Sequence, residues 1–143
     1  MALSPVYLYI LMRTDLASLN PGKAAAQASH CSNQMKYEAE AYIRSFAGTT
    51  GHNPDLAFML KEWEQETGKG FGTCIVLGVK EAQMREVVAI AEEMGLHAGI
   101  THDPTYPLLD GETLHLIPLD TCAYIFARKS DAALVVGDLS LLP

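Results

Sequence analysis

The segment best suited to chemistry is 21–30, which reads Pro-Gly-Lys-Ala-Ala-Ala-Gln-Ala-Ser-His. It follows an apolar segment typical of a buried strand and opens an alanine-rich segment that favours a helix. A helix N-terminus beyond the carboxyl end of a strand offers unpaired backbone N–H groups and a positive dipole end. Lys23 lies in this first turn, where a cation is unfavourable for the dipole. Its presence therefore indicates a role other than helix stability.

Lys23, Gln27 and His30 recur at positions i, i+4 and i+7, so they share one face of the expected helix. Two interpretations of this polar stripe stay open on spacing alone. It is either the wall of a cleft or the solvent-facing side of the helix. The segment is not a phosphate-binding P-loop, because one glycine precedes the lysine and no Ser or Thr follows it.

The pattern of strands and helices expected around residues 21–30 predicts an α/β fold. Apolar runs at 6–13, 71–79 and 97–101 indicate strands, the first two of them buried. Helical periodicity runs over 23–46, 54–67 and 81–94, with Asn20 as N-cap and Pro21 at the first helical position. Gly48, Gly51 and Pro54 break the first two helices apart, and Gly95 ends the third.

The last third of the chain predicts a hairpin. Residues 103–111 contain two prolines and an Asp-Gly turn signal. Residues 113–117 and 121–127 are either one long bent strand or two strands, and 132–136 are a short helix or strand. We expect one domain over residues 1–143. Its architecture is a three-layer α/β/α arrangement, with a mixed, mostly four-stranded sheet and helices on both faces.

Composition narrows the classes of protein. The 143 residues are 49% apolar and 19% charged, which fits one compact domain and excludes disorder. Three cysteines without a close pair indicate reduced thiols in a cytoplasmic protein rather than a disulfide framework or a zinc site. We expect no membrane association, because the first apolar run is far too short to span a bilayer. The net charge of −7 offers nucleic acid no broad attraction, so any such site must be a local basic patch.

A family resemblance rests on the order Arg13-Thr14-Asp15-Leu16 followed by Gly-Lys-x-Ala-Ala-Gln-x-Ser-His at 22–30. This pattern resembles the peptidyl-tRNA hydrolases of the archaeal and eukaryotic type. The resemblance continues through Trp63, the helix that ends before Leu96, Asp103 and the Gly-x-Leu-x-Leu-Leu motif at 137–142. It therefore covers almost the whole chain.

The sequence departs from the family pattern after Asp103. The family usually has Asp-Ala-Gly-x-Thr-Gln, then a short turn and a strand that begins with Thr. This chain has Asp-Pro-Thr-Tyr-Pro at 103–107 and a longer hairpin. Thr105 is the best counterpart of the family's Thr-Gln pair. Thr113 and Thr121 are alternatives for the later threonine, and Thr121 is preferred because it keeps the distance to the C-terminal motif.

The resemblance implies hydrolysis of the ester that joins a peptidyl group to the 3′ end of tRNA, without a metal or cofactor. Such chemistry needs an activated water and a group that holds the oxyanion. Lys23 would stabilise the oxyanion or bind phosphate, and Asp103 would orient or deprotonate water or pair with Lys23. Thr105 and Thr121 would hold the water or the substrate by hydrogen bonds. His30 would act as the proton shuttle.

Each of these residues also has an ordinary structural interpretation. Asp103 before Pro104 is typical of a turn, and Thr121 suits any strand. His30 is equally well explained as a half-buried helix residue. Gln27 is a candidate substrate contact, although a tie between helix and sheet explains it better.

The implied partner is tRNA, whose phosphates require basic side chains. The candidate contacts are Arg13, Lys36, Arg44, Arg128 and Lys129, and a solvated charged surface is the competing interpretation. A homodimer is expected from the resemblance.

Two other functions remain open: an inactive member of the fold that binds RNA or protein, and a small-molecule ester or amide hydrolase. Turnover separates the first alternative from the hydrolase, and substrate size separates the second.

Overall fold

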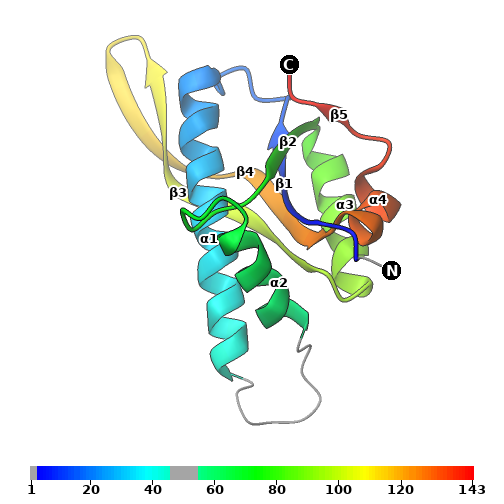
Figure 1. Ribbon diagram of the computed structural model, residues 1–143. Coiled ribbons are helices and arrows are strands. Elements are labelled where there is room, and N and C mark those ends of the chain that lie inside the picture. Colours follow the sequence, from blue (N-terminus) through cyan, green and yellow to red (C-terminus); the bar gives the residue numbers. More distant parts are fainter. Residues whose placement is uncertain (1–2, 46–54) are drawn as a thin grey trace.

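The computed structural model describes residues 3–45 and 55–143. It contains a mixed sheet of five strands in the order β3-β4-β1-β2-β5, flanked by four helices (Figure 1). The strands are β1 Val6–Arg13, β2 Cys74–Val79, β3 His97–Asp110, β4 Thr113–Arg128 and β5 Ser140–Leu141. The helices are α1 Pro21–Ser45, α2 Asp55–Gln65, α3 Glu81–Glu93 and α4 Lys129–Val136. The predicted α/β class is confirmed, and the two-residue β5 adds a fifth strand to the four expected.

The central strand β1 has one parallel and one antiparallel neighbour, and helices pack on both of its faces. It pairs parallel with β2 through the α1–α2 crossover and antiparallel with β4. Every β1 residue except Tyr7 is buried, because the strand has neighbours on both edges and helices on both faces. Side chains alternate between two cores, one under α1 and α2 and the other under α3 and α4.

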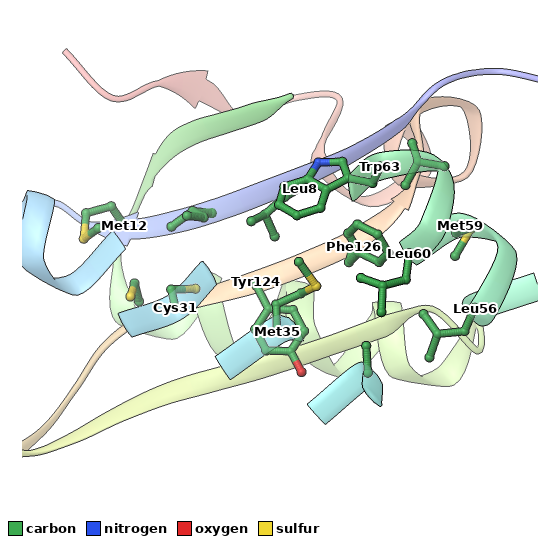
Figure 2. Close-up of a cluster of buried hydrophobic side chains, with 14 residues drawn as sticks. Leu8, Met12, Cys31, Met35, Leu56, Met59, Leu60, Trp63, Tyr124 and Phe126 are labelled. Carbon is green, nitrogen blue, oxygen red and sulfur yellow. The ribbon is translucent and has the colours of Figure 1, made fainter. Parts of the chain in front are cut away.

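The core beneath α1 and α2 is aromatic and sulfur-rich. Trp63 of α2 meets Phe126 of β4 edge to face, with ring centroids 5.7 Å apart (Figure 2). Cys31 and Met35 descend from α1 onto the same surface. This packing fixes the position of the 25-residue α1 on the sheet. All three cysteines are free, as the sequence predicted.

The hairpin differs from its expected form. The turn follows Asp110 as the Asp-Gly signal predicted, but the strand before it is longer than the expected 97–101, because residues 103–110 continue β3. Two prolines fit in this strand because β3 is an edge strand and its register shifts between Asp103 and Tyr106. The alternative of one long strand is confirmed for β4. Its distal part projects beside the N-terminal end of α1 (Figure 1).

Two smaller boundaries also differ. The second strand begins at Cys74 rather than residue 71, and half of its residues are only partly buried because its outer neighbour β5 is two residues long. The segment 132–136 is helical within α4. Phe46, Gly48, Gly51 and Pro54, expected at the end of the first helix and the start of the second, lie outside the described residues. No helix among residues 3–45 and 55–143 is long and apolar enough to cross a membrane.

The start of α1 carries the predicted cap. The Asn20 side-chain Oδ1 accepts a hydrogen bond from the Lys23 backbone N–H at 2.9 Å. We predict that Asn20→Ala lowers the free energy of unfolding by about 1 kcal/mol. Asn20→Asp should retain most of the stabilisation from the cap, because aspartate also accepts the hydrogen bond. Urea unfolding at neutral pH measures both. Equal stability of the alanine variant and the parent would show that the cap contributes nothing.

Candidate active site

Asp103 of β3 is the buried carboxylate of the site, with 8% of its surface exposed. Its Oδ2 accepts a hydrogen bond from Gln27 Nε2 at 2.7 Å. Its Oδ1 accepts from the Thr105 backbone N–H at 2.9 Å and from Thr105 Oγ1 at 3.3 Å. Burial raises the pKa of Asp103, but these hydrogen bonds and the nearby His30 outweigh burial and leave the pKa below its usual value. The side chain is therefore an anion at neutral pH.

Gln27 of α1 connects this carboxylate to Thr121 of β4. Thr121 Oγ1 donates to Gln27 Oε1 at 2.6 Å, and both side chains are buried. A carboxylate only accepts hydrogen bonds, so the amide nitrogen must face Asp103 and the amide oxygen must face Thr121. The network therefore has one orientation. The structure brings Gln27, Asp103, Thr105 and Thr121 together, whereas Thr113 lies at the exposed hairpin turn.

Two irregularities in the β3–β4 ladder aim these side chains at α1. Thr101 pairs with Cys122 while His102 pairs with Asp120, which leaves Thr121 as an extra residue in β4. Strict alternation would place Thr121 and Cys122 on opposite faces, but both contact Gln27. A second shift places two residues, Pro104 and Thr105, between paired positions of β3. Such bulges commonly redirect side chains beside functional sites.

Lys23 is half-buried one turn of α1 before Gln27. Its Nζ donates to the Pro107 backbone carbonyl at 2.8 Å and lies 5.1 Å from the centre of the Tyr106 ring. Here α1 and β3 run in opposite directions, because Gln27 meets Asp103 and Lys23 meets Pro107. The Cα atoms of Lys23 and Gln27 therefore lie about 6 Å apart along the helix axis, the rise of four residues. The polar contact of the Lys23 ammonium is with Pro107 rather than with the Asp103 carboxylate.

His30 is exposed on the turn of α1 that follows Gln27. It lies near enough to Asp103 for its positive charge to lower the pKa of that carboxyl. Lys23, Thr105 and His30 thus form an accessible rim, and Gln27 and Thr121 lie beneath it.

Arg13 lies within protein rather than at the surface, with 8% of its side chain exposed. Its guanidinium binds the carboxylates of Asp15 at 2.9 Å and Glu81 at 3.1 Å, and donates to the Asp120 backbone carbonyl at 3.0 Å. The hydrogen bond from Arg13 lowers the pKa of Asp15. In this arrangement the Arg13 guanidinium binds groups at the strand end and at the bulge before Thr121.

Asp120 is held from the other side as well. Its carboxylate binds Arg85 at 2.6 Å and His102 at 2.7 Å, and the Arg85 contact lowers the Asp120 pKa. No local pattern in the sequence indicates the contact between Arg85 and Asp120, because these two residues are 35 positions apart in the chain. The bulge is thereby anchored by two arginines on the face opposite the Gln27 bridge.

The other predicted tRNA contacts do not form one patch. Lys36 lies 13 residues beyond Lys23 on a different face of α1, with Glu64 of α2 at 3.8 Å. Arg128 binds Glu62 and the Ser4 carbonyl. Arg128 and Lys129 lie at the opposite end of the sheet from Asp103, because Arg128 pairs with Val6 at the start of β1. Arg44 is exposed near the C-terminal end of α1.

Cavities lie away from the polar cluster. One, of about 630 Å³, lies at the Arg128 end and is lined by Leu96, His97 and Phe126 among others. Another, of about 470 Å³, lies on the β2 side of α1 and includes Met12, Ala25 and Leu142 in its wall. The polar cluster lies on the β3 side of α1, outside both cavities. Within the described ranges, no cluster of three His, Cys, Asp or Glu side chains is arranged to hold a metal ion.

Comparison with known proteins assigns the family. Residues 6–142 match the model of the family described as Peptidyl-tRNA hydrolase PTH2. No curated protein sequence matches the chain significantly. Because the family match spans nearly the whole chain, the protein belongs to the peptidyl-tRNA hydrolase PTH2 family. It is an ester hydrolase that acts on peptidyl-tRNA and releases tRNA and peptide, and the predicted resemblance is confirmed.

The Gln27 bridge makes a direct prediction about stability. Gln27→Met preserves approximate side-chain volume but leaves one Asp103 oxygen without a donor and leaves the Thr121 hydroxyl only a weak contact with Cys122 Sγ at 3.6 Å. The free energy of unfolding should fall by about 2–4 kcal/mol, because each stranded buried group costs about 1–3 kcal/mol. Urea unfolding of the parent and the variant measures this loss.

The matched control is Gln34→Met two turns further along α1. Gln34 bonds to the Ile100 carbonyl and to Glu38, but it is only partly buried, so water replaces the lost contacts. Its loss should stay within about 1 kcal/mol. Equal losses at the two glutamines would contradict a special role for the Gln27 bridge.

Proposed function

We propose that Lys23 and Asp103 are the catalytic residues of this peptidyl-tRNA hydrolase. The observation that supports the proposal is the alignment of α1 with β3. It holds the Lys23 ammonium and the buried carboxylate bound by Gln27, one helical turn further along α1, on the same side of the helix. Ester hydrolysis needs these two charges for different tasks, one to stabilise the oxyanion and the other to activate water.

In the proposed reaction, water attacks the ester carbonyl carbon and the carbonyl oxygen becomes an oxyanion. Lys23 stabilises this charge, because an ammonium has three N–H donors and Pro107 accepts only one. The C–O bond to the ribose then breaks, the peptide leaves as a carboxylic acid, and the ribose oxygen takes a proton. The positive end of the α1 dipole lies beside Lys23 and adds to the stabilisation.

Asp103 acts on the attacking water. A carboxylate offers about four acceptor positions, and Gln27 and Thr105 fill three of them, which leaves one for water. Its lowered pKa makes it a weak base, so its main task is to orient the water and to accept a proton only as the new C–O bond forms. His30 on the exposed rim then transfers a proton to the ribose oxygen.

The two threonines have different roles in this proposal. Thr105 is exposed beside the carboxylate, so its hydroxyl can contact both Asp103 and the bound water. Thr121 has no exposed surface and its hydroxyl proton is used by Gln27, so it cannot touch substrate. We therefore assign Thr121 and Gln27 as positioning residues. Arg13 has a similar structural task at the β4 bulge.

The proposal extends to the tRNA and to the assembly of this enzyme, for which we keep the prediction of one domain over residues 1–143. Lys23 and exposed cations on α1 would contact phosphate, and the negative net charge makes this binding weak and dependent on salt. We also propose a cytoplasmic homodimer. It is supported by the free cysteines and by exposed apolar side chains on the distal hairpin, namely Leu109, Leu114 and Leu116.

The test is release of N-acetyl-aminoacyl groups from tRNA by the purified protein. Lys23→Met and Asp103→Asn should each lower kcat by about 100- to 1000-fold, because each removes a charge that acts in the transition state. Thermal melting should remain within a few degrees of the parent for Lys23→Met.

Lys61→Met is the matched control, since Lys61 is exposed on α2 and lies outside the site. It should retain parental turnover. Near-parental turnover by Lys23→Met or Asp103→Asn would remove that residue from the catalytic assignment. Equal release from an unblocked aminoacyl-tRNA and from the N-blocked substrate would show that the site does not discriminate between them.

A further inference from the structure

Tyr106 of β3 is fully buried, yet it belongs to neither of the two hydrophobic cores. It lies three residues after Asp103, where the β3 register shifts. A large buried aromatic side chain outside the cores needs another explanation. Its contact with Lys23, a residue of the proposed active site, supplies one.

The ring of Tyr106 faces the Lys23 ammonium, with Nζ 5.1 Å from the ring centre. A cation at this distance is attracted by the negative face of an aromatic ring, and the attraction strengthens when water is excluded. The Pro107 carbonyl accepts one N–H from the same ammonium at 2.8 Å. Two consecutive residues of β3 therefore hold Nζ, one through the ring and one through the backbone.

Tyr106 is itself held in place. Its hydroxyl is hydrogen-bonded to Ser18 Oγ at 2.9 Å, and Ser18 belongs to the connection between β1 and α1. Its backbone pairs with Ile117 across the hairpin. The ring is thus fixed at both ends, and it contacts the side chain that begins three residues into α1. A lysine stem has many rotamers, so a rigid contact surface limits the positions of its ammonium.

We propose that Tyr106 is a positioning residue that aims the Lys23 ammonium at the ester carbonyl oxygen of the bound substrate. The inference rests on the proposed catalytic role of Lys23. The ring and the Pro107 carbonyl hold the ammonium on the β3 side and leave its other N–H groups for the substrate oxygen. Positioning of this kind acts in the transition state more than in substrate binding, so it affects kcat rather than KM.

The first test compares Tyr106→Phe with Tyr106→Leu. The phenylalanine variant keeps the ring and loses only the bond to Ser18, so kcat should stay within about threefold of the parent. The leucine variant removes the ring, and kcat should fall about 10- to 100-fold with KM almost unchanged. Where Tyr106→Leu does not reach the parental circular dichroism, Tyr106→Met carries the same comparison.

A spectroscopic measurement separates positioning from general loosening of the fold. Protons on the Lys23 side chain above an aromatic ring resonate upfield. The Lys23 ε-methylene signals, assigned by their loss in Lys23→Met, should be shifted upfield in the parent and in Tyr106→Phe. They should return to the usual lysine position in Tyr106→Leu. Unshifted signals in the parent would overturn the contact itself.

A double variant completes the test. If Tyr106 acts through Lys23, then Tyr106→Leu should lower kcat no further in a Lys23→Met background. A further drop as large as in the parent would overturn the inference. Parental kcat in a folded Tyr106→Leu, with Lys23→Met inactive, would refute the Tyr106 role alone. Parental kcat in Lys23→Met would instead refute the catalytic assignment of Lys23.

Discussion

The site depends on one buried amide that binds in two directions. Gln27 donates to Asp103 and accepts from Thr121, so a single α1 side chain joins both strands of the hairpin. An amide is neutral and carries a donor and an acceptor on separate atoms, so Gln27 can donate to a carboxylate and accept from a hydroxyl at once. A carboxylate in place of Gln27 would repel Asp103. A hydrocarbon would remove the amide donor from Asp103 and the amide acceptor from Thr121, in a site where lost hydrogen bonds of buried groups are costly.

This bridge requires the irregular ladder beneath it. In a regular antiparallel pair, Thr121 and Cys122 would face opposite layers, and Thr121 would point toward α3. The extra residue in β4 turns it toward α1, and the Arg13 and Arg85 contacts hold Asp120, the residue before the bulge, on the α3 side. The arginine contacts on the α3 side of the sheet therefore hold Thr121 in place on the α1 side. The proposed hydrolase reaction then needs only the Lys23 ammonium and the Asp103 carboxylate, which lie beside this bulge.

Much of this arrangement could be predicted from the sequence. The elements 6–13, 54–67 and 81–94 have clear apolar periodicity, and the Asn20 cap follows from residue type alone. Lys23 was indicated by its place in the first turn of the expected helix, and family resemblance supplied Asp103 and the choice of Thr121. The hairpin and its Asp-Gly turn were predicted, but the continuation of β3 through residues 103–110 was not, because Pro104 and Pro107 argue against a strand when its edge position is unknown. The contact of Tyr106 with Lys23 joins residues 83 positions apart, and no local pattern signals such a pair.

The central claim is that the Gln27 bridge holds Asp103 as an oriented anion. The most direct measurement is the titration of the Asp103 side-chain carboxyl by carbon-13 NMR, in the parent and in folded Gln27→Met. The account predicts a pKa below the ordinary value of about 3.9 in the parent and a clearly higher pKa in the variant, where burial acts without the amide. An unchanged pKa in the variant, or an ordinary value in the parent, would contradict it.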